Sequence, residues 1–392
     1  MIIQPDLSLY KIDNKELILY IKENNINNIM TKRKIVFIFP PDDKNKLQKT
    51  DCNESNTPPN SNVIPFEPLL PESPKILDEM DKPLIIIDKK IDTLKDLIEL
   101  GKMYCTTKRY NFDLKQLNYL VPSLTELNNM IGMNKVKQDI VDHILFYIQK
   151  LDKESSDMMH TLIQGPPGVG KTELAKIIGR IYNAMGILKN NKFIKANRSD
   201  MIAQYLGQTA PLTQKVINSA IGGILFIDEV YSLGNAEKRD CYAKECIDTI
   251  NENLTNKKTE FICIIAGYKD DIMNCFLSYN KGLERRFPVR FTIEPYTGEE
   301  LYLIFKKKVN DLEWVVGDDI TKNFFITNYK SFKNYGGDME ILFSKCKRAY
   351  SRRTFVTNDK TKVITLEDLN EAYKYFDNHD MKDDMMWCEM FL

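Results

Sequence analysis

A glycine-rich loop carries the clearest chemical signal in the sequence. Residues 165–172 read Gly-Pro-Pro-Gly-Val-Gly-Lys-Thr, which matches the pattern G-x-x-x-x-G-K-[ST] in full. Glycines at these positions let backbone N–H groups turn inward around a β-phosphate, and the helix that follows adds its positive N-terminal end. Lys171 would reach the β- and γ-phosphates, and the Thr172 hydroxyl would ligate Mg²⁺. Because an apolar run precedes the loop and an amphipathic segment follows it, a chance glycine-rich turn is disfavoured.

An acidic pair follows a second apolar run. Asp228 and Glu229 come directly after Ile224–Ile227, which suits a neighbouring strand of the same sheet. Asp228 would hold Mg²⁺ through its water shell, and Glu229 would polarise an attacking water. Acidic residues at strand ends also cap helices, but a phosphate loop in the same chain favours the catalytic interpretation. Hydrolysis, as opposed to binding alone, depends on Glu229.

Strands and helices must alternate to position these residues. Continuous apolar runs indicate strands buried on both faces, and amphipathic segments such as Glu173–Met185 lie between them. The alternation predicts an α/β domain with a parallel sheet and helices on both sides. The predicted strands are Leu162-Ile163, Phe193–Ala196, Ile224–Ile227 and Phe261–Ala266.

Composition disfavours several classes of protein. The chain has 392 residues with 55 Lys+Arg and 55 Asp+Glu, and this balance disfavours general binding to a nucleic-acid backbone. Its apolar runs are far shorter than the ~20 residues that cross a bilayer. The eight cysteines form no C-x-x-C pair, which disfavours a zinc ribbon or a dithiol site. With no signal peptide evident at the N-terminus, the sequence predicts a soluble cytoplasmic protein.

Shifts in composition divide the chain. Residues 40–83 are rich in Pro, Asn, Ser, Asp and Lys, and they predict a disordered linker because they bury too little apolar surface to offset the entropy of ordering. After about Pro295 the apolar spacing is purely helical. The expected parts are an N-terminal segment of unknown role (1–39), the linker (40–83), a helical approach segment (84–130), an α/β domain (131–295), a helical domain (296–378) and a C-terminal tail (379–392).

Several further motifs resemble the CbxX/CfqX branch of the AAA+ ATPases, which includes red-type Rubisco activases and stage V sporulation protein K. The resemblance rests on Tyr205–Ala210, Gly222–Leu233, Glu245–Ile250 and Ala266–Tyr268, and it extends over residues 120–378. It implies a P-loop AAA+ core, with a parallel sheet sandwiched by helices, followed by a small all-helical lid domain. The Asn- and Lys-rich composition favours a member from a large DNA virus or a protist.

The resemblance implies how ATP and Mg²⁺ are held and cleaved. Lys171 and Glu229 would be catalytic, and Thr172 and Asp228 would hold the metal. Arg286 matches the arginine finger that reaches the γ-phosphate of a neighbouring subunit, with Arg285 in reserve and a solvated surface pair as the alternative. Residues expected to contact the nucleotide are Ile131, Gly132, Gly165, Pro166, Pro167, Gly168, Val169, Gly170, Lys171, Thr172 and Glu173.

The segment Tyr205-Leu206-Gly207 matches the pore loop with which AAA+ rings grip an extended polypeptide. An aromatic side chain holds a chain by contact area without demanding a sequence, and glycine permits movement. The alternative is that Tyr205 only packs in a surface turn.

The lid departs from the family pattern. Where many members have a sensor arginine after Gly337-Asp338, this chain has Glu340. Either a basic residue of the same helix replaces that arginine, or lid motion is coupled to the nucleotide differently. The candidate replacements are Lys345, Lys347 and Arg348.

Together these features predict an ATPase that forms a homo-oligomeric ring, expected to be a hexamer, and threads or remodels a protein substrate. Two alternatives stay open. A nucleic-acid motor or loader is disfavoured by the neutral net charge, and a nucleotide-gated scaffold with slow turnover is motivated by Glu340. No motif identifies the substrate. No membrane association is expected, and for a viral member the compartment would be the host cytoplasm.

Overall fold

The computed structural model describes residues 82–149, 158–357 and 360–374. The chain divides into units of residues 1–73 and 74–392, and every described residue belongs to the second unit. The predicted N-terminal segment, the predicted linker up to residue 81 and the predicted tail from residue 379 lie outside the described residues. Within the described part, no helix is both long and apolar enough to cross a membrane.

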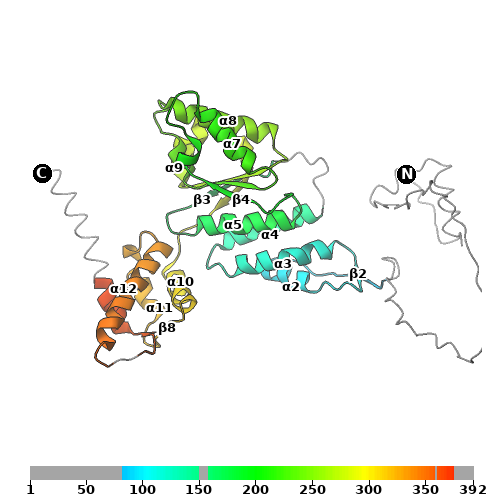
Figure 1. The fold of residues 1–392 in the computed structure, drawn as a ribbon. Helices are drawn as coiled ribbons and strands as arrows, with labels where there is room; N and C mark the ends of the chain where they lie inside the picture. The colour runs from blue at the N-terminus through cyan, green and yellow to red at the C-terminus, as the bar shows by residue number, and fades with distance from the viewer. Residues whose placement is uncertain (1–81, 150–157, 358–359, 375–392) are drawn as a thin grey trace, which may run out of the picture. The chain divides into compact units, whose positions relative to one another are not determined.

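A five-stranded parallel sheet lies at the centre of the α/β domain (Figure 1). Its strands are β3 (Thr161–Gln164), β4 (Phe193–Ala196), β5 (Ile224–Ile227), β6 (Ile262–Gly267) and β7 (Val289–Thr292). Their order across the sheet is β4-β5-β6-β3-β7. All residues of β5 and β6 are buried, as their continuous apolar sequences predict. The two strands predicted at 193–196 and 224–227 are confirmed at the predicted bounds, and β6 begins one residue later than predicted.

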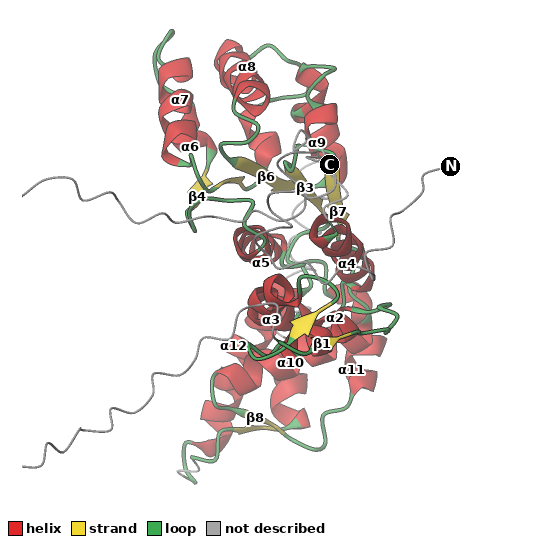
Figure 2. Ribbon diagram, turned by 90° about the vertical axis from the view of Figure 1, so that its right-hand side faces the viewer, coloured by secondary structure: helices red, strands yellow, loops and turns green. Residues whose placement is uncertain are grey.

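Helices cover both faces of the sheet (Figure 2). One face is covered by α4 (Asn134–Ile148) and α5 (Lys171–Ala184), and the other by α7 (Thr209–Ser219) and α8 (Cys241–Asn256). Alternate strand residues enter two separate cores, since successive side chains of a strand point to opposite faces. Ile163 packs in the α5 core and Leu162 in the α8 core. The shorter elements of this domain are α6 (Arg198–Met201), α9 (Lys269–Cys275) and the 3₁₀ helices η2 (Val230–Leu233), η3 (Leu277–Tyr279) and η4 (Glu284–Arg286).

The approach segment is a pair of helices that packs on α5. These are α2 (Leu94–Lys102), which begins with a capping box at Thr93, and α3 (Leu114–Asn128). Arg180 of α5 forms an ion pair with Glu126 of α3 at 2.6 Å. The helices agree with the prediction, but the segment also holds a strand pair that the sequence pattern did not indicate. Its members are β1 (Leu84–Ile85) and β2 (Arg109–Tyr110), which are parallel.

The lid is helical, as predicted, with one addition. Its helices are α10 (Gly298–Asp311), α11 (Lys322–Thr327) and α12 (Gly336–Thr354), with a 3₁₀ helix η5 (Tyr329–Ser331) and helical residues 366–374. Thr297 and Glu300 form a capping box at the start of α10. The addition is a two-stranded parallel sheet of β8 (Val315–Val316) and β9 (Val363–Ile364). It joins the segment after α10 to the segment before helical residues 366–374.

Candidate functional site

The glycine-rich loop connects β3 to α5. Gly168 and Gly170 have φ angles of +68° and +89°, in the left-handed region that residues with a side chain rarely adopt. Gly170 is the last residue before α5, so this turn brings the N-terminus of the helix to the loop. The first four N–H groups of a helix have no partner inside the helix. The loop and helix together are therefore suited to bind an anion such as a phosphate group.

Lys171 bonds to the loop that it follows. Its ammonium donates to the carbonyl oxygens of Gly165 (2.9 Å) and Pro166 (2.7 Å). It also lies 4.7 Å from the centre of the Tyr268 ring. Burial lowers the pKa of Lys171, and the charge of Asp228 works against that shift. A phosphate would be a stronger, charged acceptor for this ammonium than the two carbonyls.

The side chains of Thr172 and Asp228 meet. Thr172 follows β3 and Asp228 follows β5, and these two strands are not adjacent in the sheet. The Thr172 hydroxyl donates to Asp228 Oδ2 over 3.0 Å. The prediction that Asp228 follows the strand next to the loop strand is wrong, because β6 lies between β3 and β5. All the strands of the sheet run parallel, so their carboxyl ends share one edge and the two side chains still converge there.

This pair of oxygen donors fits Mg²⁺. Magnesium prefers oxygen ligands and is usually bound by one or two protein groups together with substrate phosphates and water. No group of three or more His, Cys, Asp or Glu side chains among the described residues could hold a metal alone. A magnesium ion would therefore be held jointly by Thr172, Asp228 and a bound nucleotide.

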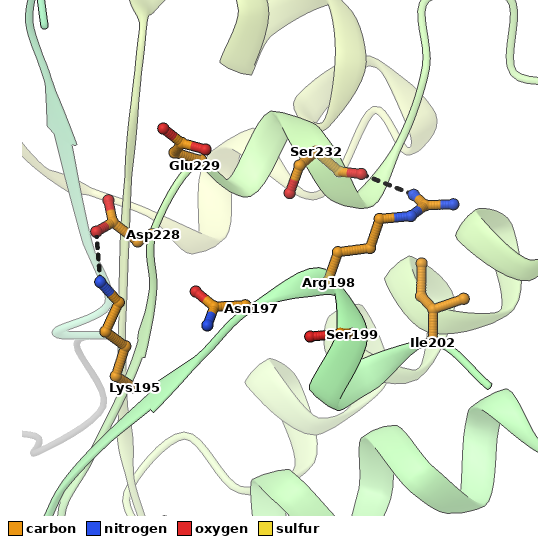
Figure 3. A pocket seen from close by; sticks show the side chains of 8 residues that line it. All are labelled: Lys195, Asn197, Arg198, Ser199, Ile202, Asp228, Glu229 and Ser232. Atoms are coloured by element: carbon orange, nitrogen blue, oxygen red, sulfur yellow. Dashed lines mark hydrogen bonds and ion pairs between the residues drawn. The ribbon is translucent and has the colours of Figure 1, made fainter.

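Glu229 shares the pocket with Asp228 but has an unusual backbone. Its φ is +49°, which is strained for a residue with a side chain. Its carboxylate and that of Asp228 line one pocket (Figure 3). Nearby, Tyr231 stacks on Tyr268 with ring centres 5.3 Å apart, and burial together with the Glu229 charge raises the pKa of Tyr231. The turn at Glu229 thus places two neighbouring carboxylates in one pocket.

A larger pocket of about 920 Å³ joins the loop, the acidic pair and the lid. Ile131 lines this pocket. The next residue, Gly132, does not line it and has a φ of +67°. A Cβ on Gly132 would meet Glu300 and Tyr296, so this segment packs against the start of the lid. The Tyr296 hydroxyl donates to the Val169 carbonyl over 2.9 Å, and burial raises the pKa of Tyr296 to about 12. The residues after β7 are thereby bonded to the phosphate loop.

The lid contributes charged residues to the pocket from two helices. Lys308 of α10 forms an ion pair with Glu340 of α12 at 3.1 Å, and both line the pocket. Lys307 also lines it and donates to the Asn129 carbonyl over 3.3 Å. The cations of the lid at this site therefore come from α10. One alternative from the sequence is that a basic residue of α12 replaces the sensor arginine, and it stays a prediction. Its candidates are not among the residues that line the pocket: Lys345, Lys347 and Arg348.

The same region of the chain matches known proteins. The model of the ATPase family associated with various cellular activities (AAA) matches residues 161–294. A CfxQ-like protein of Acanthamoeba polyphaga mimivirus is 38% identical over 363 residues, which cover 89% of this chain and 86% of that protein. The chain belongs to the CbxX/CfqX family of AAA+ ATPases. As an AAA+ ATPase it is a P-loop enzyme that hydrolyses ATP.

Two cellular relatives of this AAA+ ATPase match more narrowly. Stage V sporulation protein K of Bacillus subtilis is 35% identical, and the match covers 50% of this chain and 62% of that protein. The chloroplastic ribulose bisphosphate carboxylase/oxygenase activase of Cyanidioschyzon merolae is 36% identical, with 49% and 64% covered. The chain thus spans less than two thirds of either relative.

The segment resembling a pore loop is exposed in this AAA+ ATPase. It lies between α6 and α7, and the Tyr205 and Leu206 side chains are 67% and 72% exposed. Gly207 has a φ of +78°, and an added Cβ there would meet no atom within 4 Å. Tyr205 therefore lies in a surface turn with its side chain largely exposed, and its assignment to a pore loop stays a prediction.

The two arginines near η4 differ in their contacts. Arg286 donates through Nε to the Thr255 hydroxyl and through Nη1 to the Gly282 carbonyl, both over 2.7 Å. Arg285 is exposed. Neither lines the nucleotide pocket of its own chain. Their assignment as finger and reserve stays a prediction.

Most of the predicted nucleotide-contacting residues of this AAA+ ATPase converge on one pocket. Gly132, Gly165 and Pro166 do not line it, although the last two hold Lys171 by their carbonyls. No sequence motif indicated Lys195 of β4, which forms an ion pair with Asp228 over 2.9 Å because of how β4 and β5 align. The predicted residues that line the pocket are Ile131, Pro167, Gly168, Val169, Gly170, Lys171, Thr172, Glu173, Asp228 and Glu229.

Proposed function

We propose that this AAA+ ATPase assembles into a homo-oligomeric ring, a hexamer, and uses ATP hydrolysis to remodel or thread a protein substrate through the ring. The observation that carries the proposal is the exposure of Tyr205 and Leu206 in a chain whose ATPase residues converge in one pocket. Adjacent large apolar side chains exposed at a loop tip offer a surface on which a partner can bind. An extended polypeptide is a suitable partner for these side chains, because an aromatic ring can hold a chain through its large contact area.

Hydrolysis of ATP at the nucleotide site would supply the energy for this remodelling. The amides of the loop and of the α5 N-terminus bind the phosphates, and Lys171 exchanges its carbonyl partners for phosphate oxygens. Magnesium, when bound with the nucleotide, offsets the negative charge of the β- and γ-phosphates. Thr172 and Asp228 orient that ion. Glu229 accepts a proton from the attacking water.

A ring is the assembly that would complete the site. Arg286 and Arg285 lie outside the nucleotide pocket of their own chain, so either could reach a γ-phosphate only in a neighbouring subunit. Repeating this contact around a closed ring satisfies every subunit. We place the ring in the cytoplasm, or in the host cytoplasm if the source is a virus.

Two variants test the proposal with opposite outcomes. Glu229→Gln should bind ATP without cleaving it, because the amide cannot accept the proton of water. Lys171→Ala should lose nucleotide binding. A pull-down from source-cell extract in the presence of ATP should recover the same client protein with Glu229→Gln and not with Lys171→Ala. Sizing chromatography with ATP should show an oligomer for Glu229→Gln. A monomer that captures no client would contradict the ring proposal.

A second candidate is a nucleotide-gated scaffold with slow turnover. It is favoured by the Lys308–Glu340 ion pair, since the lid presents a carboxylate to the pocket and engages a lysine that would otherwise face phosphate. Sustained phosphate release by the wild-type protein would exclude this candidate. A single turnover followed by arrest would favour it over threading.

A further inference from the structure

A lysine from the edge strand of the sheet reaches the proposed magnesium site. Lys195 belongs to β4, and it lies opposite Phe226 in the parallel register of β4 and β5. Residues two apart on a strand share a face, so Asp228 follows Phe226 on the face where Lys195 emerges. The Lys195 ammonium lies 5.9 Å from the Phe226 ring centre. It also forms an ion pair with Asp228 Oδ2 over 2.9 Å, drawn as a dashed line in Figure 3.

The oxygen that binds Lys195 is the one that also binds Thr172. Thr172 Oγ1 donates to Asp228 Oδ2 over 3.0 Å, so both donors converge on a single carboxylate oxygen. Thr172 and Asp228 are also the two protein groups that fit Mg²⁺. The ammonium of Lys171 bonds to the loop carbonyls instead of to this carboxylate. Lys195 is therefore the basic residue that forms a direct ion pair with Asp228.

A partly buried carboxylate needs such a partner. The Asp228 side chain is only 18% exposed, and it lies beside the carboxylate of Glu229. Taking a carboxylate out of water without a compensating cation is unfavourable, and a second carboxylate nearby adds repulsion. The Lys195 side chain is 47% exposed, so its flexible stem can carry the ammonium back into solvent.

We propose that Lys195 is a positioning residue that competes with magnesium for Asp228 and so sets the Mg²⁺ concentration needed for tight nucleotide binding. This inference rests on the proposed Mg²⁺–nucleotide site. Two cations repel when they approach one carboxylate, so the ion pair with Lys195 weakens the attraction of Asp228 for the metal or its bound water. Without magnesium, Lys195 keeps Asp228 paired with Thr172 and the site preformed.

The test is a titration of a fluorescent ADP analogue at controlled free Mg²⁺, with wild type, Lys195→Met and Lys195→Arg. Lys195→Met keeps the length of the side chain and removes its charge. It should lower the free Mg²⁺ that gives the half-maximal increase in ADP affinity by roughly twofold to fivefold, the range expected for a partly exposed ion pair. ADP affinity in EDTA should be unchanged. Lys195→Arg should behave like the wild type.

A matched control separates this effect from net charge. Lys192→Met removes an exposed lysine just before β4 and should leave the Mg²⁺ dependence unchanged. Circular dichroism melts confirm that each variant is folded. Equal Mg²⁺ dependence in Lys195→Met and wild type would overturn the inference, and so would weaker ADP binding in EDTA, because the lysine would then contact phosphate. Wild-type protein that binds no nucleotide at any Mg²⁺ concentration would remove the proposed site and this inference with it.

Discussion

The backbone amide of Gly336 donates a hydrogen bond to the carbonyl oxygen of Gly168, with 3.1 Å between the two atoms. Gly336 begins helix α12 of the lid, and Gly168 belongs to the phosphate loop. The two segments are so close that a Cβ on Gly168 would collide with the Asn334 carbonyl. Tyr335, directly before Gly336, adopts a strained φ of +45°. The lid therefore contacts the nucleotide loop directly through main-chain atoms.

Gly168→Ala should separate the lid from the loop and weaken ADP binding by roughly tenfold or more, because the added methyl occupies the place of the Asn334 carbonyl. The matched control is Gly186→Ala, where φ is also positive (+78°) but no atom lies within 4 Å of the new Cβ. That control should lose only about 1–2 kcal/mol of stability from the left-handed backbone. ADP titration and chemical denaturation measure both effects. Equal ADP affinity in Gly168→Ala and Gly186→Ala would show that the contact between the lid and the phosphate loop does not support nucleotide binding.

The buried His160 should make stability depend on pH. Its Nδ1 accepts the Cys263 N–H over 3.0 Å, so the proton of the neutral ring is on Nε2, which donates to the Leu254 carbonyl over 3.2 Å. Burial lowers the pKa of His160 from 6.5 to about 4. As the pH falls, the His160 ring is therefore protonated at a higher pH in the unfolded chain than in the folded one. The contribution of neutral His160 to the free energy of unfolding is fully present above pH ~6.5 and is lost as the pH falls from about 6.5 to 4.

Between pH 7 and pH 5 this loss should be about 2 kcal/mol in the free energy of unfolding. Urea denaturation at the two pH values measures it. His160→Gln keeps a donor and an acceptor but does not titrate, so its stability should change less over this interval than that of the wild type. Parallel pH dependence in the two proteins would show that other groups are responsible.

Tyr205→Ala should lower client remodelling by roughly tenfold while ATP turnover stays near the wild-type value, because the lost contact is with substrate and not with nucleotide. Tyr119→Ala is a suitable comparison, since that tyrosine is similarly exposed (61% against 67%) but lies on α3. The client recovered with Glu229→Gln serves as substrate in an unfolding assay. Normal processing by Tyr205→Ala would exclude threading by this loop.

Arg286→Ala should lower ATP turnover by ~10³-fold with little change in ADP affinity, if its guanidinium stabilises the transferring phosphate of a neighbour. Arg285→Ala tests the reserve position in the same assay. Because Arg286 also bonds to Thr255, Thr255→Val is needed as a control that removes this bond and keeps the guanidinium. Turnover by Thr255→Val should be close to that of the wild type. A loss as large as that of Arg286→Ala would assign Arg286 a structural role.

The nucleotide residues could be predicted because their chemistry is local. Gly168 and Gly170 adopt conformations that favour glycine, and Lys171 and Thr172 follow at fixed spacing on the first turn of α5. The strand β5 was equally clear, because a continuous apolar run is what a strand buried on both faces requires.

Features that depend on distant pairing could not be predicted. β7 follows Pro288 and includes exposed Arg290, so it lacks the continuous apolar pattern of the inner strands. The insertion of β6 between β3 and β5 is a property of topology and leaves no local signature. The Lys195–Asp228 ion pair likewise depends on the register between β4 and β5. The two-residue strands of the lid are too short for any periodicity to appear.

In the described part of the chain, β3 lies between β6 and β7 and pairs with both, and these strands come about a hundred or more residues later in the chain. During translation the phosphate loop therefore leaves the ribosome long before either flanking strand has been made. Until residue 292 has emerged, β3 has an unpaired edge that another nascent chain could join. ATP offers no early protection, because its pocket also needs α10 and α12. The newly made chain must stay unaggregated through most of its synthesis before any nucleotide can stabilise it.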